Sequence, residues 1–291
     1  MINVTDIQVM KPLLGSHGFH FSKAKGQNFL IASWVPQQIA EDAGVDRSAG
    51  VLEIGPGIGP LTQQLCLRAG KVVACELDER LKPILDLTVG EFDNLEIIWQ
   101  DVLKTDVKAL VAEKFAGLRP MACANLPYYI TSPILSALLE AECFDSVTVM
   151  VQKEVADRMC AGPGSKDYGS LSVAVQYYSA PRIVEQVPPS SFLPHPKVTS
   201  AIVTMDLYEE PPVQAADEHL FDAIVRAAFE QRRKTLVNAL SSSPAVPYGK
   251  EQVQDALASL GLDASIRGEK LSIPDLSLIH ISEPTRRYAI S

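Results

Sequence analysis

Residues 53–59 read Glu-Ile-Gly-Pro-Gly-Ile-Gly, and this stretch decides the fold. A short apolar run, residues 48–52, precedes it, and residues 60–67 that follow have apolar positions at helical spacing. A strand, a glycine turn and a helix in this order open a doubly wound α/β sheet. Glycines let the backbone pass close to a ligand, and the start of the helix offers unpaired N–H groups. The stretch therefore predicts a site for a nucleotide-like cofactor, with Gly55 and Gly57 in the turn.

The spacing of the glycines and the ends of the next two strands indicate which cofactor is bound. Enzymes that bind NAD or FAD carry G-x-G-x-x-G, whereas Pro60 stands here in place of the last glycine. Two apolar runs, residues 71–75 and 95–99, lead to Glu76 and Asp101. Glu76 lies where such folds hold a ribose, and Asp101 can accept a hydrogen bond from an adenine amine. An ordinary strand end or N-cap is the alternative interpretation of Asp101.

A second motif, Asn125-Leu126-Pro127-Tyr128, follows a fourth apolar run. An adenine N6 amine is a poor nucleophile because its lone pair is delocalised into the ring. Two acceptors that pull on its hydrogens would localise that lone pair, and Asn125 and the Leu126 carbonyl are candidates. Pro127 restricts Leu126 to extended backbone and so fixes the direction of the carbonyl. With Tyr128 as an aromatic face for the base, the motif predicts methyl transfer to a nucleobase.

Structural alternatives accompany this interpretation. In the first alternative, the tetrapeptide is a strand-to-helix turn with no role in catalysis, and Thr131 or Ser132 caps a helix over residues 133–139. Phe192 lies in a proline-rich loop and is either a rigid aromatic face or a core residue. His195 is expected to be a surface residue, because the methylated nitrogen becomes acidic once attacked and water can take its proton.

In this order the motifs resemble those of the small-subunit (16S) rRNA adenine N6,N6-dimethyltransferases, the KsgA/RsmA family. The resemblance runs from about Lys25 to Asp275 and includes residues 26–30, 191–198 and 229–236. It implies a Rossmann-like class I methyltransferase sheet with a small C-terminal α-helical subdomain, and S-adenosyl-L-methionine as cofactor. It also implies dimethylation of two adjacent adenosines in the 3′-terminal hairpin loop of 16S rRNA during small-subunit biogenesis.

The resemblance also assigns roles to residues, and it implies no metal. Around S-adenosylmethionine it places Gln27, Asn28, Leu30, Gly55, Gly57, Glu76, Asp101, Val102 and Asn125, with Glu76 on the ribose and Asp101 on the adenine. Around the target it places Asn125, Leu126, Pro127, Tyr128 and Phe192, with Tyr128 and Phe192 stacking on the two faces of a flipped adenine. Flipping costs least in an unpaired loop, which is the target expected here.

The charge balance restricts where RNA can bind. The chain has 26 Lys and Arg against 35 Asp and Glu, a net charge of −9, so a basic surface must be local. The candidates are Lys197, Arg226, Arg232, Arg233 and Lys234, with Lys23, Lys25, Arg267 and Lys270 beside them. A solvated helix face is the alternative interpretation of residues 232–234.

Composition and hydropathy patterning indicate the state of the cysteines, the location of the protein and its domain organisation. Five cysteines lie singly in apolar surroundings, which is typical of reduced core residues rather than of disulfides or metal sites. No run reaches transmembrane length and residues 1–18 lack a signal pattern, so we expect a cytoplasmic protein, and a monomer. Residues 1–24 are a weakly patterned lead-in, 25–208 a methyltransferase domain and 209–275 a helical RNA-binding subdomain that begins with one helix over 221–241. Residues 276–291 read as an atypical, non-native tail.

Two other functions remain open at this point. One is methylation of large-subunit rRNA, which the proline-rich loop around Phe192, Pro133 and the sequence pI of about 5.1 make less favoured. The other is a ribosome-assembly or transcription factor that keeps the fold without turnover. The intact motif residues, from Glu76 to Tyr128, speak against that function. A DNA adenine methyltransferase would more often carry two prolines after the Asp or Asn.

Overall fold

The computed structural model describes residues 2–18, 28–213 and 215–281, and the chain divides into two compact units. The first unit comprises Met1–Ala156 and Ser179–Leu207, and the second comprises Asp157–Tyr178 and Tyr208–Ser291. The sequence predicted that the methyltransferase domain meets the helical subdomain at one point in the chain, between residues 208 and 209. The structure differs because Tyr168, Val173 and Tyr177 are buried in the core of the C-terminal helices, although they precede two strands of the first unit in sequence.

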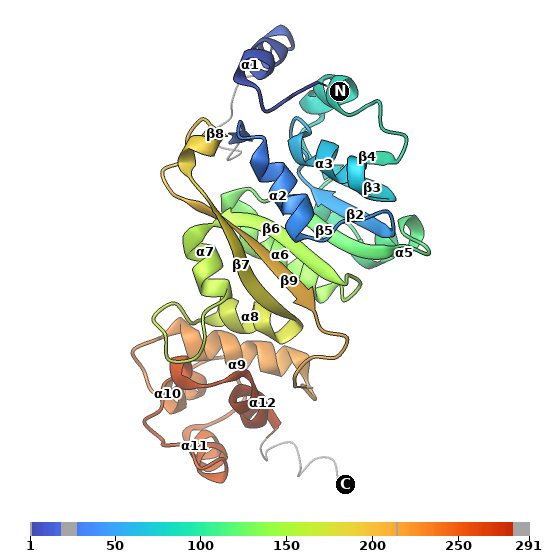
Figure 1. The fold of residues 1–291 in the computed structure, drawn as a ribbon. Helices are drawn as coiled ribbons and strands as arrows, with labels where there is room; N and C mark the ends of the chain where they lie inside the picture. The colour runs from blue at the N-terminus through green and yellow to red at the C-terminus, as the bar shows by residue number, and fades with distance from the viewer. Residues whose placement is uncertain (1, 19–27, 214, 282–291) are drawn as a thin grey trace. The chain divides into compact units, whose positions relative to one another are not determined.

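A seven-stranded sheet, in the order β4-β3-β2-β5-β6-β9-β7, forms the centre of the first unit (Figure 1). Its strands are β2 (Ala49–Ile54), β3 (Lys71–Glu76), β4 (Leu95–Trp99), β5 (Arg119–Asn125), β6 (Ser146–Gln152), β7 (Ser179–Val187) and β9 (Ser200–Leu207). Strands β4 to β6 of this order are parallel, and β9 is antiparallel to both neighbours. The predicted α/β sheet with an antiparallel edge is confirmed. The strand order reverses between β2 and β5, and ligands bind beyond the carboxyl ends of strands at such a point.

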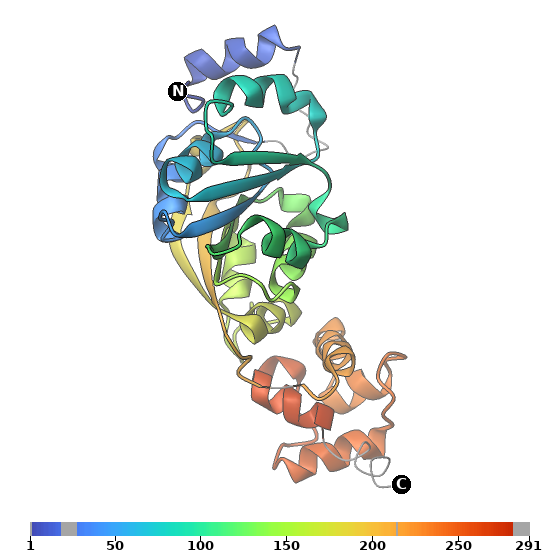
Figure 2. The same cartoon turned by 90° about the vertical axis from the view of Figure 1, so that its right-hand side faces the viewer.

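Helices cover both faces of this sheet. Helices α2 (Trp34–Asp42) and α3 (Pro60–Arg68) share a core with sheet residues such as Val51, Val72 and Met121. Helices α5 (Val107–Lys114) and α6 (Thr131–Glu140) lie on the opposite face (Figure 2). All six residues of β2 are buried, as is typical of a parallel strand covered on both faces. The first unit also contains α4 (Lys82–Thr88), and α7 (Lys153–Met159) follows β6.

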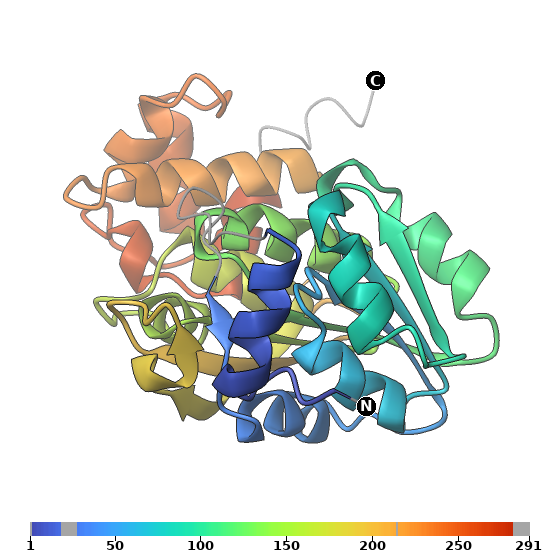
Figure 3. The ribbon, with the colours of Figure 1, turned by 90° about the horizontal axis from the view of Figure 1, so that it is seen from above.

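A helix that the sequence did not reveal, α1 (Ile7–Ser16), stands in the predicted lead-in. The Asp6 side chain caps it by accepting a hydrogen bond from the Gln8 N–H. Its buried residues Met10 and Leu14 pack in one apolar cluster with Ile84 of α4, beside which it lies (Figure 3). The described part of the lead-in therefore belongs to the first unit.

The second unit is helical. It contains α8 (Ser170–Tyr178), α9 (Glu218–Glu230), α10 (Leu236–Ser241), α11 (Lys250–Ser259) and α12 (Ile273–Ile281) around one apolar core. The prediction of one helix from residue 221 to 241 is wrong, because α9 ends at Glu230 and the Thr235 side chain caps a separate α10. The Lys234 N–H donates to the Gln231 carbonyl, so residues 231–234 form a turn.

The predicted tail starts later than the sequence suggested. Leu276 and Ile279 are buried in the core of the second unit, and α12 continues to Ile281. Residues 276–281 are therefore part of the fold, and residues 282–291 lie outside the described residues. None of the helices in the described ranges has the length and apolar content needed to span a bilayer.

Candidate functional site

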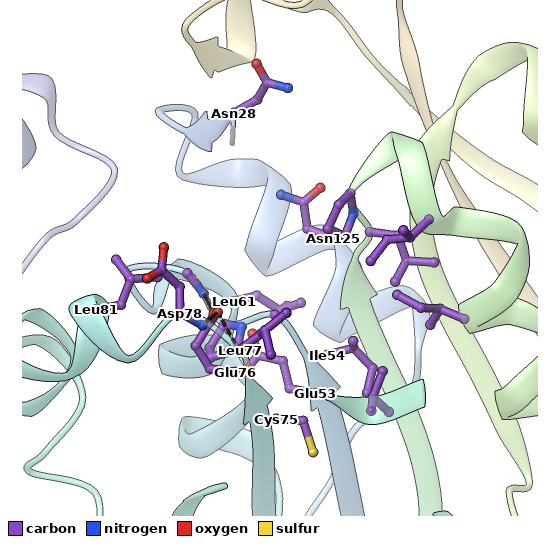
Figure 4. Close-up of a pocket in the computed structure, with 18 of the residues that line it drawn as sticks. Asn28, Glu53, Ile54, Leu61, Cys75, Glu76, Leu77, Asp78, Leu81 and Asn125 are labelled. Carbon is purple, nitrogen blue, oxygen red and sulfur yellow. Dashed lines mark hydrogen bonds between the residues drawn. The ribbon is translucent and has the colours of Figure 1, made fainter. Parts of the chain in front are cut away.

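A cavity of about 200 Å³ opens at the carboxyl ends of the parallel strands of the first unit. Its walls come from the glycine turn after β2, the residues after β3 and β4, the turn after β5, and a two-stranded sheet of β1 (Phe29–Leu30) and β8 (Phe192–Leu193). In Figure 4, Glu76 and Asp78 lie on one side of this pocket and Asn125 on the other. The structure thus brings together the two motifs that the sequence singled out.

The glycine turn leaves space toward this cavity. Gly55 and Gly57 have φ values of 70° and 60°, in the left-handed region that side chains disfavour. A Cβ at Gly55 would meet no atom within 4 Å, whereas one at Gly57 would lie 3.4 Å from the Phe29 ring. Helix α3 then starts at Pro60 with no side-chain cap. The open space at Gly55 and the uncapped helix start suit a polar ligand that lies against the turn.

Glu76 is held by the backbone around it. Its Oε1 accepts hydrogen bonds from the N–H groups of Leu77 (2.9 Å) and Asp78 (2.8 Å), and its Oε2 accepts one from Gly57 (3.2 Å). Burial raises the pKa of Glu76, and these N–H groups oppose the rise. With four lone-pair sites on a carboxylate and three in use, Oε2 retains room for one hydroxyl donor.

Asp78, which the sequence analysis did not single out, also lines the cavity. Its buried carboxylate binds the Arg80 guanidinium through two hydrogen bonds of 2.8 and 2.6 Å. Both oxygens of Asp78 are engaged by Arg80. The second carboxylate of this wall is therefore an anchor for the loop after β3, and Glu76 stays the main acceptor for a ligand.

Glu53, the first residue of the glycine stretch, is a functional candidate that the sequence analysis passed over. It is 1% exposed and lines the cavity, and its Oε2 has no hydrogen-bond partner among the described residues. Burial raises the pKa of Glu53 to about 8, and the nearby charge of Glu76 adds to the rise. Thr62 lies close enough to oppose it, yet its Oγ1 has no hydrogen-bond partner either. The one sequence signal that could have identified Glu53 as a candidate is its position directly before the glycine turn.

Asp101 fits both interpretations of the sequence. It caps the short helix over Val102–Lys104, with Oδ1 accepting from the Leu103 N–H at 3.0 Å. It also lines the cavity together with Val102, which is buried. The second carboxylate oxygen makes no hydrogen bond to a described residue, so the cap leaves one acceptor for a ligand amine.

The turn after β5 presents two free acceptors. Neither the Asn125 side chain nor the Leu126 carbonyl has a hydrogen-bond partner within the described part of the chain, although both residues line the cavity. The turn is rigid, because the Pro127 carbonyl accepts from the Ile130 N–H (3.2 Å) and from the Thr131 hydroxyl (3.1 Å). Thr131 thus ties the turn and does not cap α6, contrary to the structural alternative, and Ser132 provides no side-chain cap either.

The remaining predicted residues surround the same cavity, except one. Asn28, Leu30 and Phe192 line it, and Leu30 pairs with Phe192 across the β1–β8 sheet. Phe192 is also buried in the core of the first unit, which confirms the core interpretation, and its role as an aromatic face for a base stays a prediction. Gln27 lies outside the described residues. His195 is exposed, as predicted, and its Nδ1 lies 3.1 Å from the Pro189 carbonyl.

The basic residues divide between the two units. Lys197 is exposed in the first unit, whereas Arg226, Arg232, Arg233, Lys234, Arg267 and Lys270 belong to the second. Lys23 and Lys25 lie outside the described residues. Arg226 pairs with Asp222 at 2.7 Å. Arg232 donates to the carbonyls of Lys166 (2.8 Å) and Tyr168 (3.0 Å), so it holds the segment before α8.

Arg233 and Lys234 are exposed in the turn between α9 and α10, and no described acidic group pairs with them. The solvated helix face is therefore wrong as an interpretation of residues 232–234, because these residues lie in a turn. Two of the three basic side chains stay available to an anionic partner.

The described residues contain no cluster of His, Cys, Asp and Glu that could hold a metal ion. Of the five free cysteines, Cys66, Cys75 and Cys123 are buried and Cys143 and Cys160 are partly so. Burial raises the pKa of Cys66 to about 12 and that of Cys75 to about 11, which keeps these thiols protonated.

The comparisons with known proteins agree with this geometry. A model of the family described as ribosomal RNA adenine dimethylase matches residues 18–275. Ribosomal RNA small subunit methyltransferase A from Lachnoclostridium phytofermentans is 50% identical over 263 residues, which cover 90% of this chain and 91% of that protein. The protein of the same name from Geobacillus thermodenitrificans is 48% identical over 270 residues, or 92% of each chain.

Two solved structures share the fold over most of both chains. A dimethyladenosine transferase from Plasmodium falciparum matches with a TM-score of 0.72 and 27% identity, covering 86% of this chain and 95% of that chain. The 23S rRNA methyltransferase ErmE matches with a TM-score of 0.65 and 26% identity, covering 87% and 98%.

Proposed function

Because the chain belongs to the ribosomal RNA adenine dimethylase family, we propose that it uses S-adenosyl-L-methionine to dimethylate N6 of two adjacent adenosines. The target is the 3′-terminal hairpin loop of 16S rRNA in the assembling small subunit, which it meets in the cytoplasm. The observation that carries the proposal is the pair of free acceptors at Asn125 and Leu126, across the cavity from Glu76.

The residues present fit the cofactor. Its ribose would be held by the remaining acceptor of Glu76, and its adenine amine by the free oxygen of Asp101, with Val102 as an apolar neighbour. The open space at Gly55 and the orphaned Oε2 of Glu53 suit the polar, positively charged end of the molecule. When bound, S-adenosylmethionine supplies an electrophilic methyl group.

The chain's own residues prepare the amine. Asn125 Oδ1 and the Leu126 carbonyl would accept its two hydrogens, which draws the nitrogen toward tetrahedral geometry and localises the lone pair. Tyr128 and Phe192 would hold the flipped base between them. No side chain is required as a base, because the attacked nitrogen becomes acidic and releases its proton to water.

Methylation of large-subunit rRNA is the competing function, supported by the similarity to ErmE. That similarity is 26% identity, whereas the small-subunit methyltransferases reach 48–50%. The curated relatives therefore favour the small subunit as substrate.

The test offers labelled S-adenosylmethionine with immature small subunits, large-subunit rRNA or duplex DNA. Label should enter only the small subunits. Mass spectrometry of the digested RNA should show N6-methyladenosine at limiting cofactor and N6,N6-dimethyladenosine at two neighbouring positions with excess cofactor. An exhaustive reaction that stops at the monomethyl stage, or label in 23S rRNA, would overturn the proposal.

A further inference from the structure

Tyr129 is an exposed aromatic side chain on the wall of the candidate site. It lines the cavity beside Tyr128, yet it is 59% exposed. Among the described residues it makes no hydrogen bond and no ring contact. An aromatic side chain that is mostly exposed contributes little to the fold, and its place on the cavity wall suggests a ligand.

The backbone turns Tyr129 away from its neighbour. Residues Tyr128–Ile130 form one turn of 3₁₀ helix, in which successive side chains point about 120° apart. Tyr128 is directed toward β9, where its hydroxyl meets Ser200 at 2.7 Å. One planar base cannot stack on both rings, so a base that lies against Tyr128 leaves Tyr129 for another group.

The backbone that carries Tyr129 is also held in place. The Pro127 φ of −62° and the hydrogen bonds from Ile130 and Thr131 to the Pro127 carbonyl fix the backbone on which Tyr129 stands. A ring on a fixed backbone loses little conformational freedom when a partner stacks on it, which favours binding.

We propose that Tyr129 is the stacking platform for the nucleotide next to the target adenosine. The inference rests on the proposed function, because two adjacent adenosines must take turns in one cavity. When one base leaves the stack, its neighbour loses a partner, and an aromatic ring at the mouth of the cavity replaces that partner. Base–aromatic stacking tolerates any base, so the same ring serves whichever adenosine waits.

The test compares Tyr129→Ala and Tyr129→Phe with the wild-type enzyme on immature small subunits. The alanine variant should lose about 5- to 150-fold in kcat/KM, mostly through KM, which is the range of one base–aromatic stack. The phenylalanine variant should stay within about 2-fold, because the ring remains. Tyr208→Ala is the matched control, since Tyr208 is 42% exposed and does not line the cavity. Cofactor affinity and melting temperature should not change in any variant.

Subunits reconstituted with an abasic nucleotide beside one target adenosine identify the partner. On these abasic subunits, kcat/KM of the wild-type enzyme should fall by as much as Tyr129→Ala lowers it on ordinary subunits. Tyr129→Ala should lower it no further. An alanine variant with wild-type kcat/KM, or a loss that persists undiminished on the abasic substrate, would overturn the inference. Failure of the proposed function looks different, because then the wild-type enzyme itself would leave small subunits unlabelled.

Discussion

The Tyr128 hydroxyl lies 2.7 Å from the Ser200 hydroxyl and joins the turn after β5 to the first residue of β9. Ser200 is fully buried, and it pairs with Gln152 of β6 and Val187 of β7 in the sheet. Burial raises the pKa of Tyr128 and the hydrogen bond to Ser200 opposes the rise, so the phenol stays protonated near neutral pH. The rigid antiparallel edge of the sheet thus holds the aromatic ring proposed to carry the target base.

Loss of this hydrogen bond should slow turnover. Ser200→Ala and Tyr128→Phe should each lower kcat by about 3- to 10-fold, the effect of a typical hydrogen bond, because the ring is no longer fixed. The double variant should be no worse than either single variant, since both remove the same interaction. Ser200→Thr, which keeps the hydroxyl, should restore most of the rate. Additive losses in the double variant would mean that the two residues act separately.

Asn125→Ala should lower kcat by on the order of 10²-fold or more, because it removes an acceptor aimed at the charge that develops on N6. Asn125→Asp keeps an acceptor oxygen and should lose less. Single-turnover methylation of small subunits measures the rate, and calorimetry measures cofactor affinity. A near-normal rate in Asn125→Ala would remove the two-acceptor mechanism.

Glu76→Ala should weaken S-adenosylmethionine binding by about 1.5–3 kcal/mol, since it deletes a charged acceptor. The substitution also frees the Gly57 N–H, so the glycine turn should loosen and the melting temperature of the free protein should fall. Glu96→Ala is the control, because Glu96 is half-exposed and pairs with Lys114 away from the cavity. Unchanged cofactor affinity in titration calorimetry would place the ribose elsewhere.

Glu53 should make the stability of the free protein depend on pH. Its pKa is raised from 4.5 to about 8 on folding, so the unfolded chain ionises first and stability falls as pH rises through this window. Glu53→Gln lacks this titration. Its free energy of unfolding should therefore rise relative to that of the wild type between pH 5 and pH 8, by on the order of a few kcal/mol at most. Urea denaturation without cofactor measures it, with Glu41→Gln as an exposed control. If the free energies of unfolding of the wild type and Glu53→Gln change in parallel with pH, Glu53 is already ionised in the folded protein over this range.

The spacing of apolar residues and glycines along the sequence predicted the sheet and the two motifs of the candidate site. The turn from Glu53 to Gly59 and the motif from Asn125 to Tyr128 lie at strand ends, and the sheet order then brings them to one edge. The break after Glu230 could not be predicted that way, because Gln, Arg and Lys favour helix. It reflects the cap by Thr235 and contacts of Arg232 with residues more than 60 positions away. The state of Glu53 likewise depends on burial, which only the folded chain provides.

The three adjacent basic residues of the turn between α9 and α10 should separate in their effects. Arg233→Ala with Lys234→Ala should lower the salt dependence of small-subunit binding by about one unit of log–log slope per lost phosphate contact, with little change in melting temperature. Arg232→Ala should mainly lower the melting temperature, because it releases the carbonyls of Lys166 and Tyr168. Arg226→Ala is the comparison, since its charge is already balanced by Asp222 and its loss should change the slope less. Binding titrations at several salt concentrations give the slopes, and S-adenosylmethionine affinity should be normal throughout. A slope that is unaltered in the double variant would assign Arg233 and Lys234 to the solvent alone and move the RNA surface to other residues.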